Sequence, residues 1–157
     1  MPLDRWGSHA GKSKAFLVGY GKTSTCSNKM LGIEMSAGGR LSKGKKSKGQ
    51  NPNEYYTWFN KKVPLKDRRY IKGSLDYGPA GWYEKYSKSQ EKNLEDGLVW
   101  LCLNNENFKW QNILGHHEIA GKKYLGTWRK NDPGGALSYD MEELRQRVRR
   151  RVEKVLG

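Results

Sequence analysis

Two segments in the C-terminal half of the chain have apolar residues that recur at intervals of three and four. In residues 82–104 the pattern consists of Leu94, Leu98, Leu101 and Cys102. From Asp140 onward it consists of Met141, Leu144, Val148, Val152 and Val155. This spacing gathers apolar side chains on one face of a helix, and that face must pack against another apolar surface. The sequence therefore predicts two amphipathic helices, of which the second is opened by Asp140.

Short apolar runs at residues 15–20, 30–35 and 111–115 predict strands. In the second run, a period of two places Glu34 on the face opposite to Leu31, Ile33 and Met35. An acid in such a strand is either paired with one of the many lysines or part of a site. The alternation of predicted strands and helices permits an α/β domain.

Residues 36–81 are basic and show no helical or strand period. They begin with a stretch rich in Gly, Ser, Lys and Asn and continue with an aromatic group, which is Tyr55, Tyr56, Trp58 and Phe59. We expect an irregular surface excursion that these aromatic side chains anchor. No internal repeat marks a second domain, so we expect one domain over residues 1–157.

The formal net charge is +14 in a chain of 157 residues. A positive potential of this size favours polyanionic partners, and nucleic acid, anionic lipid and anionic wall polymers all qualify. The alternative is that many of the lysines and arginines form a solvated face. No apolar run is long enough to span a membrane, and residues 1–11 have no signal-peptide pattern, so we expect a soluble protein that reaches its site of action by lysis, in a virion or by another export route.

His116 and Asp132 are candidate metal ligands. His116 follows a predicted strand, and Asp132 lies in the turn segment 131–135. A histidine nitrogen and a carboxylate oxygen are ordinary zinc ligands. By themselves, such residues are more often a surface histidine and a turn-forming aspartate, so the surrounding sequence decides between the two interpretations.

Four segments around these residues resemble one family and follow its order. Residues 115–120 read GHHEIA, and residues 129–134 read RKNDPG. They are similar to the zinc segment of the type 2 N-acetylmuramoyl-L-alanine amidases, which is Gly-His-x-acid-Ile-Ala followed by Lys-x-Asp-Pro-Gly. Residues 6–11, WGSHAG, resemble the Trp-His-Ala-Gly element of that family, and residues 31–35, LGIEM, resemble its Ile-Gly-Ile-Glu-Leu strand.

The resemblance implies a fold and an activity. The fold is a three-layer α/β domain in which helices flank a mixed central β-sheet. The activity is that of a zinc-dependent hydrolase, such as a phage or other lytic enzyme, which cuts peptidoglycan between N-acetylmuramic acid and L-alanine. Peptidoglycan of the bacterial cell wall is then the main partner, and the basic surface attracts anionic wall or envelope polymers.

The resemblance also assigns roles to individual residues. His116 and Asp132 become ligands of Zn2+, and Glu34 becomes the general base. Lys130 becomes the cation that stabilises the oxyanion. These roles suit hydrolysis of an amide at zinc.

Further assignments concern three residues near the expected cleft. His9 and Trp6 would line the substrate cleft. His117 replaces His116 as the ligand if the register shifts. Neighbouring strand residues point to opposite faces, however, so only one of the two histidines can face the cleft.

The chain departs from the family at the first zinc ligand, a histidine that ends the opening strand upstream of the Trp-His-Ala-Gly element. Only five residues precede Trp6. We therefore expect an N-terminally incomplete domain whose third ligand comes from a second chain or segment, or from His9. Residues 121–128 also lengthen the interval between His116 and Asp132.

Two other functions follow from these departures and from composition. A chain without a complete metal site would be a non-catalytic peptidoglycan-binding or virion structural protein. A basic protein that binds nucleic acid through residues 40–72 is the third alternative.

Overall fold

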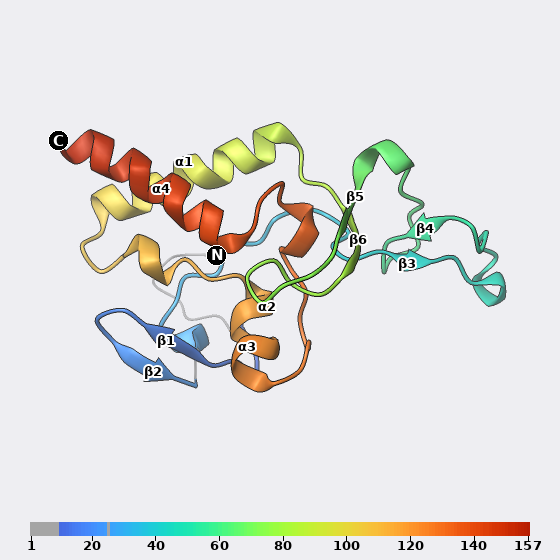
Figure 1. Ribbon diagram of the computed structural model, residues 1–157, viewed down its shortest axis with the longest axis horizontal. Coiled ribbons are helices and arrows are strands. Elements are labelled where there is room, and N and C mark those ends of the chain that lie inside the picture. Colours follow the sequence, from blue (N-terminus) through green and yellow to red (C-terminus); the bar gives the residue numbers. More distant parts are fainter. Residues whose placement is uncertain (1–9, 25) are drawn as a thin grey trace.

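The computed structural model of the protein describes residues 10–24 and 26–157. Its α-helices are α1 (Lys88–Asn104), α2 (His116–Ile119), α3 (Lys122–Leu125) and α4 (Met141–Leu156). Its strands are β1 (Ala15–Leu17), β2 (Gly21–Thr23), β3 (Ser42–Lys43), β4 (Tyr55–Tyr56), β5 (Arg68–Ile71) and β6 (Gly81–Glu84). Short turns of 3-10 helix are η1 (Cys26–Asn28), η2 (Lys46–Lys48), η3 (Leu65–Asp67), η4 (Trp110–Asn112) and η5 (Gly134–Ala136). In Figure 1, α1 and α4 lie above α2, α3 and the β1–β2 hairpin, and the β3–β4 pair extends to the right.

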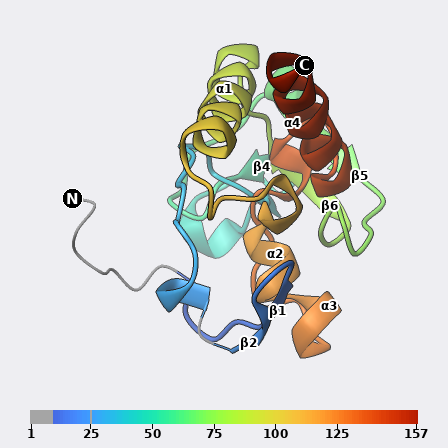
Figure 2. The same cartoon turned by 90° about the vertical axis from the view of Figure 1, so that its left-hand side faces the viewer.

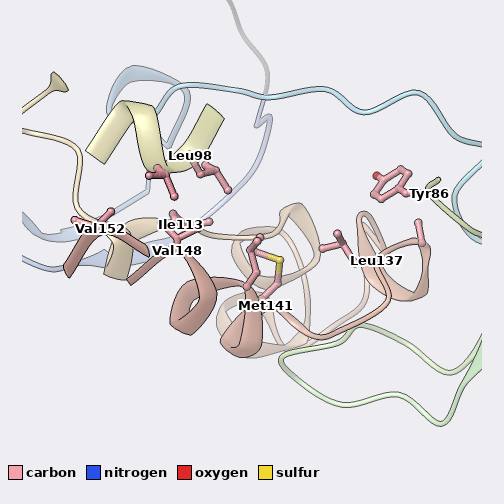
Figure 3. Packing of buried hydrophobic residues seen from close by; sticks show 10 residues of the cluster. Tyr86, Leu98, Ile113, Leu137, Met141, Val148 and Val152 are labelled. Carbon is pink, nitrogen blue, oxygen red and sulfur yellow. The ribbon is translucent and has the colours of Figure 1, made fainter. Parts of the chain in front are cut away.

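The two long helices build the main core, as their apolar pattern predicts. Ser87 caps α1, because its hydroxyl accepts a hydrogen bond from the Gln90 amide and the Gln90 side chain accepts one from the Ser87 amide. Asp140 caps α4 by accepting a hydrogen bond from the Glu143 amide. Figure 3 shows the buried cluster between these helices and their neighbours, which is Tyr86, Leu98, Val99, Ile113, Ala136, Leu137, Met141, Leu144, Val148 and Val152.

The helix boundaries differ from the sequence pattern at two points. The helix expected over residues 82–104 is confirmed only from Lys88 on. Residues 81–84 instead form β6, which pairs with β5 from Arg68–Glu84 to Ile71–Gly81. Val155 is 65% exposed, so the apolar stripe of α4 ends before it.

Ion pairs join α1 and α4 on their outer side. Arg147 and Arg151 of α4 lie 3.4 Å and 3.6 Å from the Glu95 carboxylate of α1, and Arg151 lies 2.6 Å from the Asp96 carboxylate. Such partly exposed pairs contribute about 0–1 kcal/mol each. Figures 1 and 2 both show the two helices side by side. Within the residues that the structure describes, no helix is long and apolar enough to cross a membrane.

The strands form three separate antiparallel pairs, β1–β2, β3–β4 and β5–β6. β1 confirms a strand within residues 15–20. The protein is therefore an α/β protein with small antiparallel sheets. No larger sheet joins the three pairs within residues 10–24 and 26–157.

The basic region 36–81 is more regular than its composition predicts, because it contains β3, β4 and β5. Aromatic contacts attach β3–β4 to β5–β6. The rings of Tyr55 and Trp82 lie 5.7 Å apart, and the Arg68 guanidinium lies 4.8 Å from the centre of the Tyr55 ring. Trp58 and Phe59 are exposed instead, so only part of the aromatic group anchors the region.

Two predicted strands are wrong. Residues 30–35 have no regular secondary structure, and no hydrogen bond joins their backbone to the rest of the described chain. Without a neighbouring strand, Leu31 and Ile33 stay 51% and 47% exposed. Residues 111–115 do not form a strand either, because Gly115 caps the N-terminus of α2. Its amide donates a hydrogen bond of 2.8 Å to the Glu118 carboxylate.

Candidate active site

A cavity of about 540 Å³ lies between residues 29–39, the first turn of α2 and the inner faces of α1 and α4. Much of its lining is apolar and comes from Met35, Leu94, Leu98, Leu137, Met141 and Leu144. Its polar lining includes Glu34, His116 and Asp132. The fold thus brings the predicted general base and both predicted zinc ligands to one cavity, although they lie far apart in the sequence.

His116 and Asp132 are in direct contact. The Nδ1 atom of His116 lies 3.0 Å from the Oδ2 atom of Asp132. Burial raises the pKa of Asp132, but the hydrogen bond and charge of His116, together with the charge of Lys130, outweigh it, so that the pKa is lowered. The Asp132 side chain is 52% exposed. An ionised, accessible carboxylate next to an imidazole suits a metal ligand.

The second ring nitrogen of His116 has no partner. Its Nε2 atom is buried and makes no hydrogen bond with the described part of the chain. Buried polar atoms in folded proteins are almost always hydrogen-bonded. His116 also lines the cavity, so this unsatisfied nitrogen belongs to a residue of the cavity wall.

His117 points into the interior and is 1% exposed. Its backbone amide lies 2.9 Å and its Nδ1 atom 3.2 Å from the Asp132 carbonyl oxygen. The two histidines begin helix α2 and are not in a strand, so the expectation that they point to opposite faces is wrong. Successive side chains in a helix differ in direction by about 100°. His116 nevertheless lines the cavity while His117 does not. His117 therefore holds the backbone of Asp132 in place.

The burial of His117 predicts a pH dependence of stability. Burial lowers the pKa of His117, against the opposing effects of Glu118 and of the Asp132 backbone. The unfolded chain takes up this proton near pH 6.5, whereas the folded chain does so only at lower pH. The free energy of unfolding should therefore fall as the pH drops below about 6.5, by at most ~1.4 kcal/mol per pH unit, until the folded-state pKa is reached.

Urea unfolding at several pH values measures this dependence. His117→Asn should be less stable than the parent protein near neutral pH, because it loses the ring contacts. It should also lose the part of the pH slope that arises below about pH 6.5. Parallel slopes for the two proteins would show that another group causes the dependence.

Glu118 anchors the first turn of α2 and is fully buried. Its carboxylate accepts the hydrogen bond from the Gly115 amide and lies 3.1 Å from the Nη1 atom of Arg145 on α4. Arg145 also donates a hydrogen bond of 3.0 Å to the Ile113 carbonyl. The amidase-like motif contains Glu118, but nothing in the sequence indicates its pairing with Arg145. The pair fixes the turn that carries His116 against α4.

Tyr86 is a site residue that the sequence reasoning missed. It lines the cavity with Glu34 and is 9% exposed. Burial raises the pKa of Tyr86, and the negative charges of Asp132 and Glu34 raise it further. The hydroxyl is therefore protonated and lies within the influence of both carboxylates. Tyr86 belongs to no motif or apolar period, since it lies in the short link between β6 and α1.

The other predicted site residues are placed less directly. Lys130 is partly buried in the loop before Asp132, and its charge lowers the pKa of Asp132. It does not line the cavity. His9 and Trp6 lie outside the described residues. Glu34 is exposed in the irregular segment 30–35.

The site offers zinc two ligands of a suitable kind. His116 and Asp132 supply one nitrogen and one oxygen, whereas a catalytic zinc ion normally has three protein ligands. In the part of the chain that the structure describes, no third His, Cys, Asp or Glu joins them in a group that could hold a metal ion. No protein-family model matches the chain, and no curated protein or solved structure matches it.

Proposed function

We propose that the chain is a zinc-dependent peptidoglycan hydrolase, similar to the type 2 amidases, that cleaves the amide between N-acetylmuramic acid and L-alanine. The observation that carries the proposal is that Glu34, His116 and Asp132 all line one cavity. The motif resemblance assigns these three residues as the base and the zinc ligands. They come from separate segments of the chain, and the structure places all three in the lining of the same cavity.

His116 and Asp132 are the residues that would hold the zinc ion. They fit it in donor type, because the Nδ1 atom of His116 and the Oδ2 atom of the half-exposed Asp132 carboxylate lie 3.0 Å apart, so one ion could bind both in place of the hydrogen bond between them. Bound zinc polarises a scissile carbonyl and lowers the pKa of water. His117 supports this pair by holding the Asp132 backbone, and Glu118 supports it by holding the start of α2.

Glu34, Tyr86 and Lys130 supply the remaining chemistry in this proposal. The Glu34 carboxylate is exposed and forms no ion pair with other described residues, so it can accept a proton from the attacking water without losing a partner. The protonated Tyr86 hydroxyl can donate a hydrogen bond to the carbonyl oxygen as negative charge develops there. Lys130 adds positive charge on the Asp132 side.

A further polypeptide segment supplies the third zinc ligand in this proposal, either from a second chain or from residues outside the described part. The backbone of residues 30–35 makes no hydrogen bond with the described chain and borders the mainly apolar cavity. A strand added along these residues would satisfy their backbone groups and place alternate side chains in the cavity. It would also extend the structure towards the three-layer arrangement with a mixed central sheet.

The alternative is a non-catalytic protein that binds peptidoglycan or serves in a virion on the same scaffold. The two-ligand site favours it, because the described residues hold no complete metal group. The hydrolase and the peptidoglycan-binding protein would both act at the bacterial cell wall, where a net charge of +14 attracts anionic polymers. They differ in zinc content and in the release of stem peptides.

Zinc content is the first test. We expect about one zinc ion per chain in protein purified without added metal, measured by elemental analysis. His116→Ala and Asp132→Asn should each lose this zinc, whereas Asp96→Asn on α1 should keep it. The zinc-loaded protein should release stem peptides with a free L-alanine amino group from insoluble peptidoglycan. If the protein sediments with peptidoglycan but contains no zinc and releases no peptides, the result would support the alternative and contradict the hydrolase.

A further inference from the structure

The turn that follows β4 presents two aromatic side chains to solvent. Trp58 is 82% exposed, the highest value among the large hydrophobic side chains of the described residues, and Phe59 is 49% exposed. Their ring centres lie 5.3 Å apart with an interplanar angle of 88°. An exposed apolar pair of this size commonly marks an interaction surface.

Hydrogen bonds hold this turn in shape, so the exposure of the two rings is part of the fold. The Thr57 amide donates to the Lys61 carbonyl at 2.9 Å, and the Asn60 amide donates to the Thr57 carbonyl at 3.1 Å. The Thr57 hydroxyl accepts a hydrogen bond of 3.0 Å from the Lys61 amide, and Thr57 is 4% exposed. The Gln50 side chain bonds to that of Asn60, which ties the turn to the loop between β3 and β4.

The segment that carries the aromatic pair is rich in positive charge. Residues 42–62, which we name the β3–β4 arm, include the exposed lysines Lys43, Lys45, Lys46 and Lys48. None of these lysines forms an ion pair with residues 10–24 or 26–157. The single acidic residue of the arm, Glu54, lies 3.0 Å from Lys62 and 3.9 Å from Arg68. Figure 1 shows the β3–β4 pair projecting from the body of the molecule, so a flat surface can approach it.

We infer that the β3–β4 arm docks on an anionic lipid bilayer, with Trp58 and Phe59 in the interface and the lysines at the headgroups. Tryptophan partitions well into the boundary between headgroups and acyl chains, and lysines near an anionic leaflet add an electrostatic attraction. This docking is independent of zinc and of hydrolysis. The docking can therefore be confirmed or contradicted independently of the proposed function.

The geometry of the rings favours a bilayer over a single-stranded nucleic acid. Single strands bind to proteins whose aromatic faces stack on successive bases along a groove. The nearly perpendicular rings of Trp58 and Phe59 offer no pair of parallel faces for neighbouring bases. An oligonucleotide is therefore the competing partner that the test must include.

Co-sedimentation with lipid vesicles tests the aromatic part of the inference. We expect the whole chain to bind vesicles of phosphatidylcholine with phosphatidylglycerol and not vesicles of phosphatidylcholine alone. Trp58→Ala should lower the partition coefficient about 10-fold, the loss expected for one large buried apolar side chain. Trp100→Ala is the matched control, because Trp100 is 62% exposed on α1, and it should bind like the parent. If Trp58→Ala and Trp100→Ala bound the anionic vesicles equally well, the inference would be overturned.

The lysines provide a second, independent measurement. Replacing Lys45, Lys46 and Lys48 by glutamine should weaken binding on the order of 100-fold at low salt. The same change at Lys22, Lys122 and Lys154, exposed residues on β2, α3 and α4, alters the net charge equally and should have a much smaller effect. Binding of the parent to a single-stranded oligonucleotide but not to anionic vesicles would also overturn the inference.

Discussion

Replacing Glu118 by alanine should lower the free energy of unfolding by about 3–5 kcal/mol, the cost of removing one partner of a buried ion pair. Arg145 is 6% exposed and lies 3.1 Å from the Glu118 carboxylate. Without that carboxylate, the guanidinium loses its fully buried partner and, among the described residues, keeps only the partly exposed Glu142 and Asp76 carboxylates, and the Gly115 amide loses its acceptor. Urea unfolding of both proteins measures the difference.

Glu142 provides the control on the same arginine. Its carboxylate lies 3.0 Å from the Nε atom of Arg145, but its side chain is 54% exposed. Glu142→Ala should therefore lower the free energy of unfolding by at most about 1 kcal/mol. If Glu118→Ala were no more destabilising than Glu142→Ala, the pair would not anchor α2.

The second large effect concerns activity. Glu34→Gln should reduce the release of stem peptides from peptidoglycan by roughly 10²- to 10⁴-fold, because the amide cannot act as the general base. The Tm should stay within a degree or two of the parent value, since the Glu34 side chain is exposed and unpaired in the described structure. The rate of appearance of free L-alanine amino groups measures the activity.

Glu106→Gln is the matched variant for this experiment. Glu106 is also exposed and makes no ion pair with the described residues, and it does not line the cavity. It should release stem peptides at the parental rate. A parental rate for Glu34→Gln as well would exclude Glu34 as the base, and a parent protein without any activity would contradict the hydrolase itself.

The long helices could be predicted because their signal is local and repeated. Leu98, Leu144 and Val148 recur with the helical period, and all three are buried. The strand expected at residues 30–35 failed for the opposite reason: a strand needs a partner, and alternation in the sequence does not supply one. β3 and β4 have two residues each, which is too short for any period to be visible.

The start of α2 could have been found from the sequence. Glu118 stands three residues after Gly115, the spacing at which a glutamate reaches back to the first free amide of a helix. The apolar run before it, however, has the composition of a strand. The site residues Glu34, His116 and Asp132 were found through motifs, which carry chemistry independently of the secondary structure around them. Tyr86 has neither a motif nor a period, so only the folded chain reveals it.

The cavity has one stiff wall and one compliant wall. The α1–α4 side is held by the apolar core within and by the pairs of Arg147 and Arg151 with Glu95 on the outer side. The opposite side, residues 30–35, has no backbone hydrogen bond to the described chain. A ligand or added segment that enters the cavity will therefore order this one wall and leave the helices where they are. Binding then costs conformational entropy only in a few residues around Glu34. Filling the cavity would therefore itself fix the position of the proposed base.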